Sequence, residues 1–189
     1  MDKDELLTRK TLASEIHQKV LLAITQPVTT TQLARKTGIP FEQCNNILIA
    51  MQTHGLVQCL NPAATRNHLF WLANQGKNIQ NYLVDGSDLS HDFPDIDWEL
   101  YASICFSQRS EVVKTLSFPM QPSQIKRRAT FKTPGLRLSG NNVRDVTRYL
   151  KEHRIVRPVK LRKKAHPGYE LTEIGLHMRR LLLQAEVRA

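Results

Sequence analysis

Asparagine and arginine recur at helical spacing towards the C-terminal end of the chain, at Asn141, Arg144 and Arg148. A rotation of about 100° per residue places them together on one helix face. The opposite face consists of Val143, Val146 and Leu150. Guanidinium groups pair with guanine O6 and N7, and carboxamides pair with adenine N6 and N7. The pattern therefore predicts a helix that contacts base edges of a duplex, with a merely solvated charged face as the alternative.

Further basic residues flank this helix and have the chemistry needed to bind phosphate groups. We expect phosphate contacts from Lys126, Arg127, Arg128, Lys132, Arg137, Lys151, Lys160, Arg162, Lys163 and Lys164. These residues fall in a preceding helix, in a turn, at the end of the base-contacting helix and in a hairpin. Clusters on neighbouring elements favour one contiguous basic surface over a solvated face.

The charge of the chain is unevenly distributed. The whole sequence of 189 residues has a formal net charge of +10. Residues 1–96 contain 8 basic and 9 acidic residues, a net charge of −1, whereas residues 97–189 contain 19 basic and 8 acidic residues, a net charge of +11. The second half therefore carries all of the excess, which indicates a polyanionic partner for that half, with double-stranded DNA first.

The elements that would position these residues occur twice. Residues 20–36 align with residues 112–128 at an offset of 92, and residues 51–57 align with residues 150–156 at an offset of 99. The second copy therefore has seven more residues between the two aligned blocks. Because only two copies occur, the repeat indicates a tandem pair of domains and not a solenoid.

Each copy predicts a helix that ends near a proline, a short second helix, a turn, a third helix, two β-segments and a closing helix. The expected first and third helices are 5–25 and 40–54 in copy one, and 97–117 and 140–153 in copy two. The fold class is mainly α with small β-hairpins (α+β). We expect domains at 1–84 and 97–189, joined by an acidic linker at 85–96.

The stretch "GYELTEIG", residues 168–175, gives this order a family resemblance. It resembles the last strand of the wing and the next helix in prokaryotic winged-helix repressors of the multiple-antibiotic-resistance and arsenical-resistance types, and in archaeal regulators. Residues 55–62 likewise resemble the helix-to-wing junction of archaeal regulators. The resemblance implies two winged helix-turn-helix domains in tandem, in which the third helix enters the major groove and the wing contacts the backbone or the minor groove.

The resemblance also assigns roles within that stretch. Tyr169 and Leu171 are expected to point into the core, and Thr172 to cap the closing helix. Gly175 is expected to allow close packing of that helix against the wing.

Copy one presents a different outward face. The positions that correspond to Asn141, Arg144, Arg148 and Lys151 are Glu42, Asn45, Ile49 and Gln52. Their inward neighbours are expected to be Phe41, Cys44, Ile47 and Met51. The carboxylate of Glu42 repels phosphate, and an exposed Ile49 favours a protein contact or a thymine methyl group. We interpret this face as a protein contact, with homodimerisation and weak DNA contact left open.

The sequence contains no phosphate-cradling glycine loop, no Cys-x-x-Cys motif and no His-Glu-x-x-His motif. We therefore expect neither an enzyme nor a cofactor, and no metal site, since Cys44 is better explained as a core thiol. Three irregularly spaced cysteines, a charged N-terminus and the lack of a long apolar run favour a cytoplasmic, nucleoid-associated protein without membrane contact.

The expected function is that of a double-stranded-DNA-binding transcriptional regulator. One alternative is a DNA-binding protein of replication initiation or plasmid maintenance, and another is a tandem winged-helix adaptor in a nucleic-acid machine. The sequence leaves open the target site, the sign of regulation, any effector and the oligomeric state.

Overall fold

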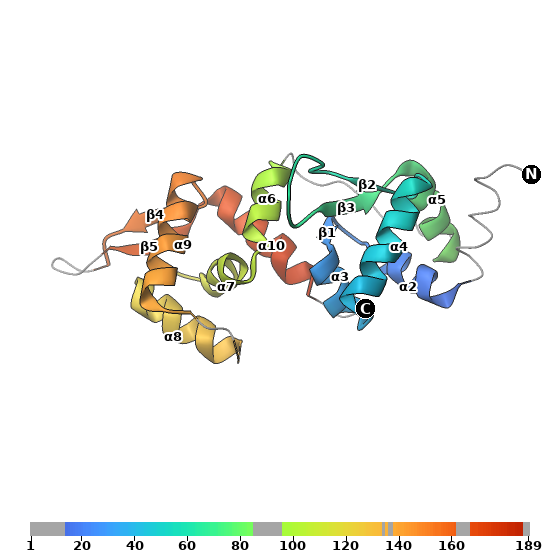
Figure 1. Cartoon of the computed structure of the whole chain (residues 1–189). Coiled ribbons are helices and arrows are strands. Elements are labelled where there is room, and N and C mark those ends of the chain that lie inside the picture. The colour runs from blue at the N-terminus through green and yellow to red at the C-terminus, as the bar shows by residue number, and fades with distance from the viewer. Residues whose placement is uncertain (1–13, 85–95, 134, 136–137, 162–166, 187–189) are drawn as a thin grey trace, which may run out of the picture. The chain divides into compact units, whose positions relative to one another are not determined.

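The computed structural model describes residues 14–84, 96–133, 135, 138–161 and 167–186. The chain divides into two compact units, a first unit of Met1–Ser103 with Ala185–Ala189 and a second unit of Ile104–Gln184. The described chain is mainly helical and contains small antiparallel sheets (Figure 1). The acidic linker expected at 85–96 lies outside the described residues except for its last residue.

In the first unit, the elements follow one another as α2 (Glu15–Ala23), β1 (Val28–Thr29), α3 (Thr30–Thr37), α4 (Phe41–Thr53), β2 (Val57–Cys59), β3 (Leu69–Leu72) and α5 (Asn74–Leu83). The strands form an antiparallel sheet in the order β1-β3-β2. A further helix, α6 (Trp98–Ile104), ends where the second unit begins. Thr29 caps α3 through a reciprocal pair of hydrogen bonds with Gln32, which explains why the helix starts directly after β1.

In the second unit, the elements are α7 (Ser107–Thr115), α8 (Pro122–Lys132), α9 (Gly140–Glu152), β4 (Val156–Val159), β5 (Gly168–Leu171) and α10 (Glu173–Gln184). The strands β4 and β5 pair antiparallel, from Val156 with Leu171 to Val159 with Gly168. Pro122 at the first position of α8 needs no hydrogen-bond partner for a backbone N–H, which suits the start of a helix.

The single helix predicted over 97–117 is wrong. Two helices, α6 and α7, occupy this stretch, because Phe106 takes an extended backbone conformation with φ −60° and ψ 135°. The backbone therefore leaves the helical path after α6 and re-enters it at Ser107. The Phe106 ring lies 5.5 Å from the guanidinium of Arg109 in the new helix.

The two units repeat the same backbone contacts at the two offsets found in the sequence. Val28 of β1 pairs with Phe70 of β3, and Met120 forms a β-bridge with Tyr169 at the corresponding positions. The pairing of residues 28 and 70 becomes that of 120 and 169 when 92 and 99 are added. The β-bridge at Met120 thus takes the place of β1 in the second unit.

The start of the closing helix also repeats, and it explains the glycines. The N–H groups of Ala73 and Thr172 donate to the carbonyl oxygens of Leu56 (2.9 Å) and Ile155 (3.0 Å), respectively. A Cβ atom added at Gly76 or Gly175 would overlap those same carbonyl oxygens. The helix can therefore pack at this distance only if the residue has no side chain.

The predicted roles in residues 168–175 are largely confirmed. The hydroxyl of Thr172 accepts a hydrogen bond from the N–H of Gly175 at 3.2 Å and donates to the carbonyl of Arg154 at 2.7 Å. Thr172 thus caps α10 and ties it to the end of α9. Leu171 is buried, as expected, whereas Tyr169 is only half-buried.

Candidate nucleic-acid interface

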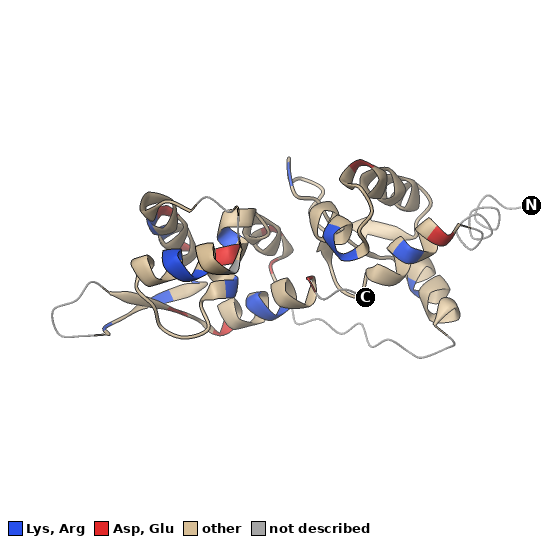
Figure 2. Cartoon of the chain, turned by 90° about the horizontal axis from the view of Figure 1, so that it is seen from below, with Lys and Arg blue, Asp and Glu red and all other residues tan. Residues whose placement is uncertain are grey.

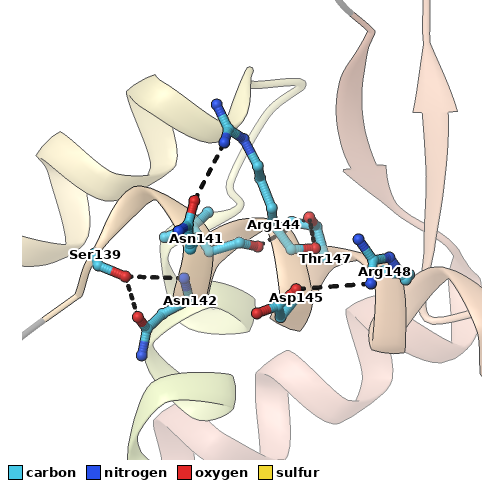
Figure 3. Close-up of polar contacts among 8 residues, drawn as sticks. Ser139, Asn141, Asn142, Arg144, Asp145, Thr147 and Arg148 are labelled. Carbon is cyan, nitrogen blue, oxygen red and sulfur yellow. Dashed lines mark hydrogen bonds and ion pairs between the residues drawn. The ribbon is translucent and has the colours of Figure 1, made fainter.

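Helix α9 has one apolar and one polar face, as predicted. Ser139 caps it by accepting a hydrogen bond from the N–H of Asn142 at 3.0 Å (Figure 3). The residues expected to face inward, Val143, Val146 and Leu150, are buried. The residues expected to face outward, Asn141, Arg144, Arg148 and Lys151, are all exposed. We call these four residues the α9 face.

Two polar contacts organise the α9 face (Figure 3). The Nη1 atom of Arg144 donates to Oδ1 of Asn141 at 3.3 Å, so these two side chains lie together. Nη1 of Arg148 lies 3.7 Å from Oδ1 of Asp145, and both side chains are about 70% exposed. An ion pair this exposed is worth little, so it does not prevent Arg148 from binding elsewhere.

Acidic residues share this helix surface, a feature that the sequence interpretation missed. Asp145 and Glu152 are exposed, and they lie at helical spacing from Arg148. The spacing of three and four residues was visible in the sequence as a signal for such pairs. The two carboxylates lower the net positive charge of α9 and add hydrogen-bond acceptors to its surface.

The basic residues of α8 differ in their surroundings. Lys126 and Arg127 are exposed, as a phosphate contact requires. Arg128 is half-buried, and its guanidinium lies 4.9 Å from the centre of the Phe118 ring. A guanidinium over an aromatic face is held by a cation–π interaction, so Arg128 has a local partner as well as a positive charge.

Three exposed basic residues that the structure describes lie in β4 or next to it in the chain. Lys160, an expected phosphate contact, follows β4 and is exposed. Arg154 and Arg157, which the sequence interpretation missed, are exposed as well. Nε of Arg157 lies 2.6 Å from Oε1 of Glu170 on the paired strand, so part of its charge is neutralised.

The structure does not describe every residue expected at this surface. Arg137, Arg162, Lys163, Lys164 and the side chain of Lys132 lie outside the described residues. The expected contact residues that the structure does describe lie on α8, on α9 and at the end of β4, and α9 packs against both of the other elements. Blue and red segments both occur on the helices of this unit (Figure 2).

An arginine of α7 fixes the orientation of α9. The Arg109 guanidinium lies 3.8 Å from the centre of the Tyr149 ring. Nδ2 of Asn142 donates to Oε1 of Gln108 at 3.1 Å, a second link between the helices. These residues line a hollow of about 450 Å³ beside α9. The contacts join positions more than 30 residues apart in the chain, so local sequence pattern could not reveal them.

In the first unit, the corresponding face of α4 is uncharged apart from Glu42. Glu42, Ile49 and Gln52 are exposed, as expected. Asn45 is half-buried, so it contributes less to the outward surface than expected. Ile49 is 51% exposed. No described residue of this helix carries a positive charge.

The expectation that Phe41 faces inward is wrong. Phe41 is 53% exposed, because it is the first residue of α4 and lies beyond the end of the core. Leu48, which is fully buried, completes the inward face with Cys44, Ile47 and Met51. Burial raises the pKa of the Cys44 thiol, and its hydrogen bond with the side chain of Thr37 opposes that shift.

The described residues contain no cluster of three or more histidine, cysteine, aspartate or glutamate side chains that could hold a metal ion. Within the same part of the chain, no helix combines the length and the apolar character needed to cross a membrane.

Comparison of the chain with protein-family models, with curated proteins and with solved structures found no match. The functional interpretation therefore depends on the geometry and chemistry of the chain itself.

Proposed function

We propose that the chain binds double-stranded DNA through its second unit and acts as a transcriptional regulator. The observation that carries this proposal is the α9 face, which presents one amide, two guanidinium groups and one ammonium group on the side opposite the buried Val143, Val146 and Leu150. This combination supports insertion of α9 into a major groove, where arginine and asparagine recognise guanine and adenine.

The order of elements supports a winged helix-turn-helix for each unit. In the first unit a helix, a strand, two helices, a two-stranded hairpin and a closing helix follow in turn, and the first strand pairs with the last. The second unit has the same order, with the Met120–Tyr169 β-bridge in place of the first strand. In such a domain, α9 would be the recognition helix and the β4–β5 hairpin the wing.

The exposed cations around α9 are suited to phosphate binding in this arrangement. Lys126 and Arg127 precede α9 in the chain, and Lys160 follows it in the hairpin. Phosphate contacts fix the position of a protein on the duplex, while base contacts supply the sequence preference. If about six phosphates are neutralised, the logarithm of the binding constant falls against the logarithm of salt concentration with a slope near −5.

The proposal is tested by selecting bound sequences from a pool of random DNA duplexes with the whole chain. The expected result is a short preferred site that contains guanine, bound more tightly than random duplex. Arg144→Ala should relax the preference at one or two base pairs, whereas Lys126→Ala should weaken binding to all duplexes alike. Recovery of no preferred site, or equal effects of both variants on specific and random duplexes, would remove the base-reading role.

The same selection distinguishes the proposed role from replication initiation or plasmid maintenance. A regulator is expected to bind sites at promoters, whereas an initiator or maintenance protein binds repeats at an origin. The distribution of the selected site in the source genome therefore separates the two.

For the first unit, exposed apolar residues on α4 favour protein contact as a second candidate function. Phe41 and Ile49 are each about half exposed, and their helix, Phe41–Thr53, contains no basic residue. If two chains pair through this face, light scattering should give a dimer for the wild type and a monomer for Ile49→Ser. A monomer for both proteins would exclude homodimerisation through α4.

A further inference from the structure

Two phenylalanine rings lie exposed beside α8 in the second unit. Phe131, on the last turn of α8, is 87% exposed, and Phe118, just before the helix, is 52% exposed. They line a groove of about 380 Å³, the α8 groove, made by Phe118, Met120, Gln124, Arg127, Arg128 and Phe131. Neighbouring apolar side chains that remain in water are typical of a binding surface.

The buried side of the α8 groove is held in place by the sheet. Met120 is 1% exposed, and its N–H donates to the carbonyl of Tyr169 at 3.0 Å. In return, the N–H of Tyr169 donates to the carbonyl of Met120 at 2.8 Å. Because β5 fixes this residue, a ligand does not have to order the buried side of the groove when it binds.

The α8 groove is positively charged. Arg127 is exposed, and the guanidinium of Arg128 lies 4.9 Å from the centre of the Phe118 ring. None of the described residues that line the groove is acidic. The charge therefore complements a ligand that carries carboxylate or phosphate groups next to an apolar group.

The first unit differs at the corresponding positions. Gln26, which corresponds to Phe118, is only 3% exposed. Phe131 lies beyond the aligned residues 112–128, and the residue at the same offset of 92, Ile39, is half-buried and packs against the core. The helix α3 ends at Thr37, followed by Gly38 in the left-handed conformation, whereas α8 continues for a further turn that carries Phe131. The aromatic walls are thus a feature of the second copy and not a requirement of the shared fold.

We propose that the α8 groove binds an acidic peptide segment of a partner protein. A bulky apolar side chain of the peptide inserts between Phe118 and Phe131, and neighbouring carboxylates pair with Arg127 and Arg128. Aromatic residues and arginine are the side chains most enriched at the energetic centres of protein interfaces. This function goes beyond DNA binding and does not involve the α9 face, although Arg127 serves both as a proposed phosphate contact and as a lining residue of the groove.

A peptide matches the groove better than nucleic acid does. A DNA duplex presents phosphates to the two arginines but has no apolar group that projects beyond the phosphates to reach the buried side at Met120. A single-stranded base can stack on an aromatic ring, but one face of the Phe118 ring is already covered by Arg128. An acidic peptide with one bulky side chain satisfies the arginines and covers both rings.

The proposal is tested by selecting peptides from a random library against the immobilised full chain. Selected peptides should contain an aromatic residue or leucine next to several aspartates or glutamates. Binding of the labelled peptides is then measured by fluorescence anisotropy. Phe131→Ser should weaken binding about tenfold or more, as expected at an interface hot spot. Arg128→Glu should weaken it further, because it places a like charge beside the carboxylates.

The matched control is Tyr82→Ser, which removes an exposed aromatic ring from α5 of the first unit, where Tyr82 is 74% exposed. This variant should bind the peptides within about twofold of the wild type, as is usual for surface substitutions. Because Phe131 is so exposed, Phe131→Ser should melt at the same temperature as the wild type by circular dichroism, so lost binding would not reflect unfolding.

Either of two results would overturn the proposal. The first is that no acidic, apolar peptides are enriched, or that those selected bind Phe131→Ser as tightly as the wild type. The second concerns a labelled single-stranded oligothymidylate. If Phe131→Ser weakens the binding of this oligonucleotide and leaves peptide binding unchanged, the groove is a nucleic-acid site.

Discussion

The two units use the same backbone contacts to present different surfaces. The inward positions of α4 and α9 are apolar except for Thr147, which replaces Leu48, whereas the outward positions change from Glu42 and Ile49 in the first unit to Asn141 and Arg148 in the second. Core positions tolerate little change because packing limits their volume and polarity. Outward positions are free of that limit, so the difference between the copies indicates where their functions differ.

The largest effect should come from the packing that the two units share. Gly175→Ala places a methyl group against the carbonyl oxygen of Ile155, and Gly76→Ala does the same at Leu56. Each change should lower the free energy of unfolding by about 3 kcal/mol, the cost of forcing atoms into a filled space. Urea denaturation measures it.

Gly140→Ala is the control for this prediction, because a Cβ atom at Gly140 would meet no atom within 4 Å. That change should leave stability equal or raise it by up to about 1 kcal/mol. If Gly175→Ala and Gly140→Ala change the free energy of unfolding equally, the close approach of α10 to the carbonyl of Ile155 does not contribute to stability.

The next largest effect should separate the two outward faces. Arg148→Ala should weaken binding to the preferred duplex by about 2 kcal/mol, the usual cost of a lost bidentate contact to guanine. Ile49→Ala, at the corresponding position of α4, should leave duplex binding unchanged. Electrophoretic mobility shift titrations measure both variants. A larger loss of affinity with Ile49→Ala than with Arg148→Ala would place the base contacts in the first unit and contradict the proposal.

Asp145→Ala sharpens the same comparison, because it removes a carboxylate that lies 3.7 Å from Arg148. Binding to random duplex should become tighter by about 0.5 kcal/mol, since repulsion of phosphate decreases and the exposed ion pair costs little to lose. Filter binding at low salt measures the change. Weaker binding to random duplex would contradict this interpretation of the helix surface.

An effect smaller than that of Arg148→Ala is expected where the two copies share a left-handed backbone conformation. Gly55 has φ 70°, and at the corresponding position Arg154 has φ 57°. Arg154→Gly should raise the free energy of unfolding by about 0.5–1 kcal/mol, because relief of the left-handed strain exceeds the entropy cost of glycine.

The reverse change, Gly55→Ala, should destabilise the chain by about 1 kcal/mol. Only strain is involved, since the added Cβ would meet the side chain of Gln75 at an ordinary 3.8 Å. Thermal melting measures both variants, and a stabilising Gly55→Ala would show that the backbone is not strained there.

The smallest effect concerns the core of the first unit. Cys44 and Val143 occupy corresponding positions in α4 and α9, and both are fully buried. Cys44→Val should therefore stay within about 1 kcal/mol of the wild type in stability. Because Cys44 is fully buried and burial raises the pKa of its thiol, Cys44 should react with a thiol reagent more slowly than the partly exposed Cys59. Equal labelling of the two thiols would show that Cys44 is accessible.

Local periodicity predicted the inner and outer faces of α9, because each turn of a helix repeats the same orientation. It failed at Phe41, since the period says nothing about where a helix extends past the core. It also missed the break at Phe106, which contains neither proline nor glycine. The contact of Arg109 with Tyr149 joins distant parts of the chain, and no local signal predicts such a contact.

The repeat in the sequence predicted more than periodicity did. Its two offsets, found without structural knowledge, also relate the β-bridge at Met120 to the pairing of Val28 with Phe70. The α8 groove was not predictable in this way, because it arises where the copies differ. Arg128 was expected to contact phosphate, but its position over the Phe118 ring depends on packing between a loop and a helix.

The most direct test of the account compares the salt dependence of duplex binding for three full-length proteins. For the wild type, the logarithm of the binding constant plotted against the logarithm of the salt concentration should have a slope near −5. Replacing Lys126, Arg127 and Lys160 with glutamine should reduce the slope by about 3, because each lost phosphate contact removes about one unit. Replacing Lys19, Arg35 and Lys77 of the first unit should leave it unchanged. A slope that changes with the first unit and not with the second would contradict the proposal that the second unit binds DNA.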